Sequence, residues 1–418
     1  MNVLLKAAKI VDPSNPELHL KKRDIHIKDG QIESIAVSTK GGGRIREIHL
    51  KNLHVSPGWF DSSVCFGEPG FEERETISNG LYVAAKSGFT DVVLNPNTLP
   101  LPDSSSDIVF LKESGKKQAA VLHPLGSLTA KSEGQDLAEL FDMHKAGAVG
   151  FYDFKKPISN ASLLKIALLY AQNFEGLVLS FPLDNQIASK GIVNEGVESV
   201  RLGLKGIPAL AEELQIARDL YILEYTGGKL HIPTISTAKG VKLVTEAKKK
   251  GLDLSCSVAL HNLYATDTSL ESFDTNFKTL PPLRTGADVK ALVKGVKEGV
   301  IDFVTTDHTP MDIEEKRVEF DNAAYGTIGL ESAFGVLLNL FDLDTAIGLL
   351  AKGRQRFGIA QPEIREGTKA NLSLFDPEPL YTFSEGDIFS TSKNSLFLGS
   401  QLKGRVYGSI AHDHITIE

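Results

Sequence analysis

The chain has 418 residues, a length at which a protein usually divides into more than one structural unit. Its hydrophobic fraction of 42% and charged fraction of 23% are those of an ordinary globular protein. The formal net charge of −8 provides no basic field, which argues against nucleic acid and anionic membranes as partners. There are only two cysteines, and no run approaches the roughly 18 apolar residues of a transmembrane helix. We therefore expect a cytoplasmic protein without a disulfide framework.

The two ends of the chain are both rich in predicted β-strands. Residues 1–54 contain short strand-like segments, with Asp29 and Gly30 placed as a hairpin turn. Residues 366–418 repeat this pattern, with apolar segments at 370–375 and 404–410. We predict that 1–54 and 366–418 together form one small β-sandwich domain.

The middle of the chain, 55–365, alternates short apolar strands with amphipathic helices. This alternation predicts a (β/α)₈ TIM barrel, in which the residues that carry chemistry follow the carboxyl ends of the strands. An open doubly wound sheet is the alternative, but the first β-to-α turn lacks a glycine fingerprint for nucleotide phosphates. The predicted strands are 54–65, 91–95, 119–123, 148–151, 176–181, 229–235, 253–260 and 301–306, and the clearest helices are 136–146, 161–171 and 237–250.

The end of the first barrel strand carries a recognisable motif. Residues 57–71 read Pro-Gly-Trp-Phe-Asp-Ser-Ser-Val-Cys-Phe-Gly-Glu-Pro-Gly-Phe. This resembles the dihydroorotase segment Pro-Gly-x-x-Asp-x-His-x-His-x-Arg-Glu-Pro-Gly-Phe. Because further matches follow in order along nearly the whole chain, it is identified as a member of the type I dihydroorotases, a branch of the metal-dependent cyclic amidohydrolases. The further matches lie at 95–98, 194–196, 201–204, 274–278, 281–285, 306–308, 329–331 and 403–406.

The resemblance implies a zinc-dependent hydrolase of pyrimidine biosynthesis. Dihydroorotase interconverts dihydroorotate and N-carbamoyl-aspartate, with metal activating water and an aspartate shuttling the proton. Asp307 stands at the position of the proton shuttle, and Asn97 stands at a position that binds substrate.

The metal-binding histidines of the family are absent. Their positions hold Ser63, Cys65, Phe181 and Thr234. Hydroxyl groups are poor zinc ligands and a phenyl ring is none, whereas catalytic zinc needs three nitrogen, sulfur or carboxylate ligands. We therefore expect a degenerate site without zinc.

The groups that hold the substrate carboxylate are missing independently. Gly67 stands where the family has arginine, Leu280 where it has asparagine, and Met311 where it has histidine. None of these side chains donates a hydrogen bond to a carboxylate. Loss of the metal ligands and of the substrate contacts together predicts that the site no longer serves this reaction.

The remaining polar residues have structural as well as functional interpretations. Cys65, Asp153 and Asp307 are the residual candidate ligands for a single metal, with Phe154 replacing the second aspartate of a family pair. We expect Asp307 and Asn97 to be vestigial and to satisfy nearby backbone groups. We expect His231 to be packed in the barrel wall, and His261 lies at a strand end from which it could reach the mouth.

These observations favour a pseudoenzyme. The family contains non-catalytic members that act as structural partners of aspartate carbamoyltransferase, and we expect this role here. One alternative is an active amidohydrolase with an atypical one-metal site, acting on dihydroorotate or another cyclic amide. The other is a small-molecule sensor that binds without turnover. A homo-oligomer is compatible with each.

Overall fold

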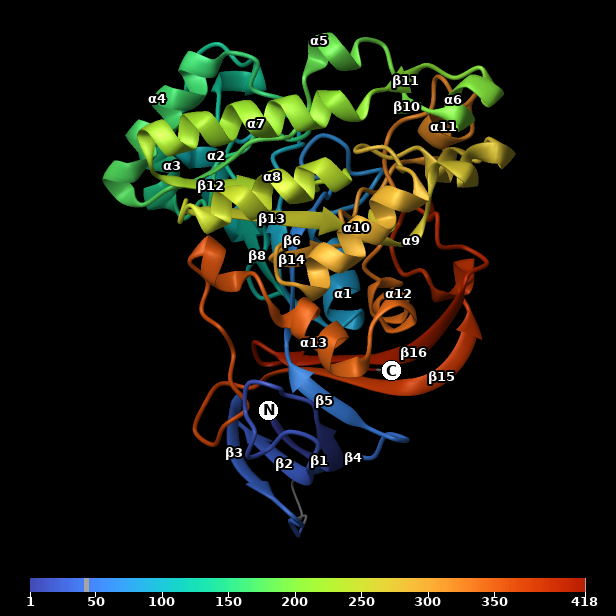
Figure 1. The fold of residues 1–418 in the computed structure, drawn as a ribbon. Coiled ribbons are helices and arrows are strands. Elements are labelled where there is room, and N and C mark those ends of the chain that lie inside the picture. Colours follow the sequence, from blue (N-terminus) through green and yellow to red (C-terminus); the bar gives the residue numbers. More distant parts are fainter. Residues whose placement is uncertain (41–44, 418) are drawn as a thin grey trace.

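The computed structural model describes residues 1–40 and 45–417, and Figure 1 shows a barrel above a sheet that contains both termini. Parallel barrel strands form two arcs, β6–β7–β8 and β9–β12–β13–β14. Phe151 bridges the arcs at one seam by pairing with Gly126 and Val178, and Val64 pairs with His308 at the other. The closed ring confirms the predicted (β/α)₈ barrel. Its strands are β6 (Trp59–Val64), β7 (Phe89–Leu94), β8 (Val121–Pro124), β9 (Leu177–Leu179), β12 (Lys229–Ile232), β13 (Leu254–Ala259) and β14 (Phe303–Thr305).

Helices surround this barrel because their apolar faces pack on the strands. The longer ones are α1 (Ile77–Lys86), α2 (Ser105–Ser114), α3 (Leu140–Ala146), α4 (Ala161–Ala171), α7 (Ala209–Thr226), α8 (Ala238–Lys249), α10 (Gly286–Lys297), α12 (Ala333–Leu340) and α13 (Leu343–Ala351). Shorter elements are α5 (Asn185–Ala188), α6 (Val197–Leu202), α9 (Leu260–Tyr264), α11 (Ile313–Lys316), and the pair β10 (Val193–Asn194) and β11 (Gly206–Ile207). Within the described ranges, no helix is long and apolar enough to cross a membrane.

The predicted elements differ most from the structure at three places. The fourth barrel strand, predicted at 148–151, consists only of the bridge residue Phe151. The helix predicted at 136–146 begins at Leu140, because Leu137 instead pairs with Thr129. The strand predicted at 54–65 is two strands in different sheets, separated at Gly58. That glycine passes so close to Asn371 that a Cβ atom would lie 1.8 Å from its side-chain oxygen.

The second sheet joins the two ends of the chain, as predicted. Its order is β17–β16–β15–β5–β1–β2–β3, with β4 also pairing with β1. The antiparallel pairing of β5 with β15 makes the connection. Asp29 and Gly30 form the predicted hairpin turn, both with positive φ. The strands of this second sheet are β1 (Asn2–Ile10), β2 (Lys22–Lys28), β3 (Gln31–Ala36), β4 (Arg46–Ile48), β5 (His54–Pro57), β15 (Asn371–Thr382), β16 (Gln401–Ala411) and β17 (His414–Ile417).

His231 lies inside the barrel wall on β12, as predicted. Its ring stacks on Phe303 with centroids 5.1 Å apart, and its two nitrogens lie 2.8 and 3.2 Å from the hydroxyls of Ser255 and Ser257. Burial, and to a smaller degree the cation of Arg356, holds its pKa well below the ordinary value of 6.5. The folded protein therefore keeps this imidazole neutral.

This depressed pKa predicts a loss of stability in mild acid. The unfolded chain binds a proton at His231 near pH 6.5 and the folded chain does not, so the free energy of unfolding falls as pH drops below 6.5. In His231→Gln the dependence should weaken by up to about 1.4 kcal/mol per pH unit. Urea unfolding between about pH 7 and pH 5 measures this slope, with the exposed His49→Gln as control. An unchanged slope in His231→Gln would contradict the assignment.

Candidate functional site

The carboxyl ends of the barrel strands bring a polar cluster together at the mouth. We call Ser63, Cys65, Asn95, Lys155 and Asp307 the mouth cluster. Ser63 Oγ donates to Asp307 Oδ1 at 3.1 Å and accepts from Asn95 Nδ2 at 2.9 Å. The cluster therefore links the ends of β6, β7 and β14 with the loop after the fourth strand position.

Asp61 fixes the seam beneath this cluster. Its carboxylate accepts hydrogen bonds from the hydroxyls of Thr305 and Thr306 and from the amides of Ser63 and Thr306. The carboxylate therefore joins the first barrel strand to the last, which positions Ser63 beside Asp307.

The central interaction of the mouth cluster is an ion pair that was not predicted. Lys155 Nζ lies 2.8 Å from Asp307 Oδ2, with side-chain exposures of 12% and 2%. Both residues have positive φ, 53° for Lys155 and 49° for Asp307, an unusual conformation for residues other than glycine. Burial raises the pKa of Asp307, and Lys155 opposes that rise. A cation supplied by the chain itself thus lies against the family's proton-shuttle position.

Cys65 is enclosed within the same cluster. Its Sγ accepts from Asn95 Nδ2 at 3.6 Å, and Thr309 Oγ1 lies 3.9 Å away. Burial raises the pKa of the thiol to about 12. At neutral pH the sulfur stays protonated, so it is a poor nucleophile.

The side chain of Asp153 forms its hydrogen bonds with a neighbouring loop and not with the mouth cluster. Its carboxylate accepts hydrogen bonds from the amides of Leu128 and Thr129, each at 3.0 Å, and from Thr129 Oγ1 at 2.5 Å. It therefore fixes the loop after β8, and the residual set of Cys65, Asp153 and Asp307 is not assembled around a metal. Over 1–40 and 45–417, no three His, Cys, Asp or Glu residues are grouped so that they could hold a metal ion. The residues at the mouth do not fit zinc.

An apolar cluster occupies the neighbouring part of the mouth. Phe181 is buried with Tyr152 and Leu179, and Phe154 and Leu280 pack against the same cluster. Phe181, Phe154 and Leu280 each replace a polar residue of the family pattern. These three departures therefore belong to one apolar cluster, which disfavours an ion or a carboxylate.

Gly67 and Met311 make no contact suited to a substrate carboxylate. A Cβ atom at Gly67 would lie 1.7 Å from the carbonyl oxygen of Phe71, so the loop in this conformation has no room for an arginine. The backbone amide of Met311 donates to Asn394 Oδ1 at 3.0 Å.

Among the buried side-chain atoms of the described ranges that have no hydrogen-bond partner, several belong to three of the residues considered above as candidates for the site. They are Asn97 through Oδ1, Thr234 through Oγ1, and His261 through both ring nitrogens. Burial lowers the pKa of His261 to about 3, with a smaller contribution from Lys155. Asn97 does not join the mouth cluster, whereas Asn95 of the same motif does.

Sequence reasoning missed Lys155 and the role of Asn95. Lys155 lies two residues after Asp153, at a strand end where side chains gather. Its position after a barrel strand is the signal in the sequence, but a lysine there belongs to none of the family motifs given above.

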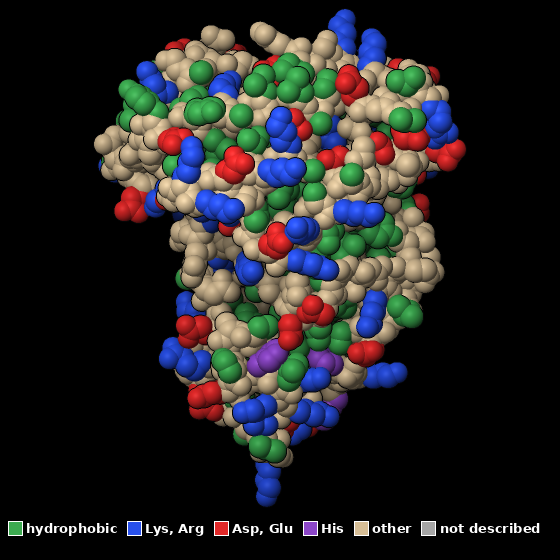
Figure 2. All heavy atoms as spheres, viewed as in Figure 1, with side chains coloured by type: hydrophobic (Ala, Val, Ile, Leu, Met, Phe, Trp, Pro, Cys, Tyr) green, Lys and Arg blue, Asp and Glu red, His purple; other side chains and the backbone are tan. Residues whose placement is uncertain are grey.

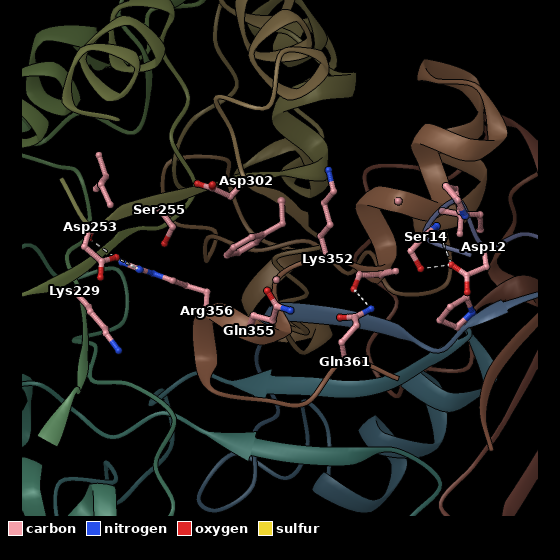
Figure 3. Close-up of a pocket in the computed structure, with 18 residues that line it drawn as sticks. Asp12, Ser14, Lys229, Asp253, Ser255, Asp302, Lys352, Gln355, Arg356 and Gln361 are labelled. Atoms are coloured by element: carbon pink, nitrogen blue, oxygen red, sulfur yellow. Dashed lines mark hydrogen bonds and ion pairs between the residues drawn. The ribbon is translucent and has the colours of Figure 1, made fainter. Parts of the chain in front are cut away.

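A cavity of about 880 Å³ lies at the opposite end of the barrel. It is lined by the starts of β12, β13 and β14 and by residues that follow α13 (Figure 3). Figure 3 shows Arg356 extending toward Asp253, with which it forms an ion pair. Asp302, another lining residue, pairs with Lys248 at 2.6 Å. Because barrel chemistry belongs to the carboxyl ends of strands, this cavity is not the candidate active site.

Comparisons with known proteins agree with this architecture. A family model described as dihydro-orotase-like matches residues 53–240. The L-hydantoinase of Arthrobacter aurescens superposes with a TM-score of 0.85 at 20% identity, covering 100% of this chain and 96% of that one. The D-hydantoinase of a Thermus species gives 0.81 at 18% identity, covering 100% and 95%. At these identities the likeness establishes the fold.

Curated relatives are more similar in sequence. The dihydroorotase of Pelotomaculum thermopropionicum is 36% identical over 425 residues, covering 100% of this chain and 99% of the relative. That of Carboxydothermus hydrogenoformans is 37% identical over 413 residues, covering 97% and 95%. With similarity of this extent along its whole length, the chain belongs to the dihydroorotase family.

Proposed function

We propose that this dihydroorotase homologue is catalytically inactive and serves pyrimidine biosynthesis as a structural or regulatory partner of aspartate carbamoyltransferase. The observation that carries the inactivity is the ion pair between Lys155 and Asp307. It supplies positive charge at the mouth without a metal ion.

An ammonium cannot replace the chemistry of zinc. Zinc keeps an open coordination position and lowers the pKa of the water bound there, whereas an ammonium only donates hydrogen bonds. Both oxygens of Asp307 are also engaged, one by Lys155 and the other by Ser63. A carboxylate held in this way is poorly placed to accept a proton from water.

Substrate binding is impaired by separate changes. The carboxylate of dihydroorotate would meet Gly67 and the apolar side chain of Leu280 in place of hydrogen-bond donors. Phe181 adds an aromatic ring to the same apolar cluster as Leu280. An unpaired carboxylate in such surroundings loses its hydration without compensation.

A second candidate is binding of a small polar molecule without turnover. The unsatisfied buried atoms of Asn97, Thr234 and His261 favour it, because buried polar groups usually have partners. The one-metal enzyme finds no comparable support, since the three candidate ligands are not assembled.

Metal content and turnover test the proposed inactivity. Protein purified without chelator should carry far less than one zinc per chain by elemental mass spectrometry, and added zinc should give no hydrolysis of dihydroorotate above background.

Ser63→His with Cys65→His should also remain inactive, because Phe181, Thr234 and Gly67 are unchanged and groups of one catalytic unit do not act additively. Calorimetric binding of dihydroorotate without turnover would favour the second candidate. Robust activity that Asp307→Ala abolishes would refute the proposal.

The proposed partner follows from chemistry and from family resemblance. Aspartate carbamoyltransferase produces the substrate of dihydroorotase, so an association between the two could outlast the second activity. The net charge of −8 and the absence of an apolar anchor in the described ranges leave protein as the large partner class that fits best.

Association should be measurable with purified components. Co-expression with the carbamoyltransferase of the same organism should give one complex by size-exclusion chromatography with light scattering. A stable contact buries on the order of 1,200–2,000 Å² in total and should raise the transferase's melting temperature. Two separate peaks at micromolar concentration, with unchanged transferase activity and melting temperature, would contradict the partnership.

A further inference from the structure

The cavity of about 880 Å³ lies where the barrel meets the second sheet. Its walls combine the starts of β12, β13 and β14 with Asp12, Ser14 and Pro57 from the side of the sheet. Small-molecule sites typically enclose about 300–1,000 Å³ and often lie between two structural units. The mouth cluster is at the other end of the barrel strands. The cavity is therefore a separate candidate binding site.

One wall of the cavity is apolar. Leu254, Phe303 and Ile347 are buried side chains that line it. The ring of Phe303 is held by stacking on His231, with centroids 5.1 Å apart. Such a wall favours a ligand with a flat, weakly hydrated face over a bare inorganic ion.

The carboxylates of the described lining already have partners within the chain. Asp253 forms an ion pair with Arg356, and Asp302 forms one with a lysine of α8 at 2.6 Å. Asp12 accepts hydrogen bonds from the amide and the hydroxyl of Ser14, at 3.1 and 2.6 Å. These carboxylates therefore do not favour a cation as the ligand.

Some donors of the lining, in contrast, have no acceptor among the described residues. Arg356 Nε is buried and without a hydrogen-bond partner. Lys352 is exposed just after α13 and forms no ion pair there. Gln355 and Gln361 add side-chain amides, which can both donate and accept. Figure 3 shows Lys352 and these glutamines between Arg356 and Asp12. Donors beside an apolar wall favour an anion that carries a flat ring with polar edges.

Gly348 is a second, independent indication of an occupant. It lies inside α13 and lines the cavity. Glycine in a helix interior is less stable than alanine. An added Cβ atom at Gly348 would meet no atom of the described chain within 4 Å, so packing within the chain does not require glycine there. A ligand that approaches the backbone of α13 closely does require it.

Basic side chains are frequent beside this junction. Figure 2 shows more Lys and Arg than Asp and Glu side chains along the lower edge of the barrel, where the surface narrows above the second sheet. The last turn of α8 contributes Lys248 and Lys249, and Lys248 pairs with the lining residue Asp302. A local positive potential favours the approach of an anion even though the net charge of the chain is −8.

We propose that this cavity binds a small anion with a heterocyclic ring, of the class of the nucleoside monophosphates. The ring lies against the apolar wall, the amides of Gln355 and Gln361 meet its polar edge, and the phosphate lies near Lys352 and Arg356. An occupant in this place contacts both the barrel and the second sheet. The inference does not depend on the proposed function, because the cavity and the mouth cluster lie at opposite ends of the barrel.

Calorimetric titration and thermal unfolding test the proposal, with the monophosphates of adenosine, guanosine, cytidine and uridine as probes. At least one should bind at one site per chain and raise the melting temperature, because a ligand of the folded state stabilises it. The matching nucleoside and inorganic phosphate should each bind at least about tenfold more weakly, because each lacks part of the contacts.

Two variants locate the site. Gly348→Leu fills the cavity and should weaken binding at least about tenfold, while the open space at its Cβ and the helix propensity of leucine favour folding. Circular dichroism checks the fold. Gly286→Leu, at the start of α10, also meets no atom within 4 Å and is the matched control, which should bind as the wild type does. Lys352→Met should weaken binding of the nucleotide but not of the nucleoside.

A wild-type chain that binds none of the four nucleotides would overturn the proposal. Affinity that is undiminished in both Gly348→Leu and Lys352→Met would place the nucleotide elsewhere on the molecule and would equally overturn it. Either result leaves the proposed function intact, because zinc content, turnover of dihydroorotate and association with the carbamoyltransferase are measured separately.

Discussion

A buried carboxylate needs partners that replace its lost hydration, and at Asp307 the main partner is a cation that organises the barrel mouth. Asp307 is fixed at the end of the last strand and has almost no contact with solvent. In the family pattern, zinc held by histidines supplies the positive charge. In this chain the ammonium of Lys155 lies 2.8 Å from the carboxylate. Under the proposed function this ammonium retains the positive charge, but it provides no open coordination position that could activate water.

Once the cation is a side chain, the rest of the mouth is no longer constrained by metal coordination. Ser63 is sufficient as a hydrogen-bond donor to Asp307, and Cys65 fills space as a buried thiol. Phe181 and Leu280 pack in one apolar cluster, and the loop at Gly67 approaches Phe71 too closely for a longer side chain. Because several of these residues would have to change together to rebuild a metal site, the proposed inactivity predicts that restoring two histidines alone does not restore the reaction.

Much of this could be predicted from sequence because it depends on local patterns. The spacing of apolar residues predicted helices α4 and α8, and the Asp29-Gly30 pair predicted the hairpin turn. The family motifs located the positions of the missing ligands. The rest depends on contacts distant in sequence. Lys155 forms an ion pair with Asp307, which is 152 residues away in the sequence. Asp153 accepts hydrogen bonds from the amides of Leu128 and Thr129. The division of the strand at Gly58 reflects its approach to Asn371, which local composition does not show.

A double-mutant cycle on Lys155 and Asp307 tests most directly whether the ammonium has taken over the charge role of the metal. Lys155→Met leaves the carboxylate buried without its cation, and the account predicts a loss of about 3 kcal/mol in the free energy of unfolding. Lys155→Met combined with Asp307→Asn should recover a large part of that loss, with a coupling energy of at least about 1 kcal/mol. Urea unfolding of the wild type, both single variants and the double variant gives these values. Single substitutions that each cost less than about 0.5 kcal/mol and add without coupling would contradict the account.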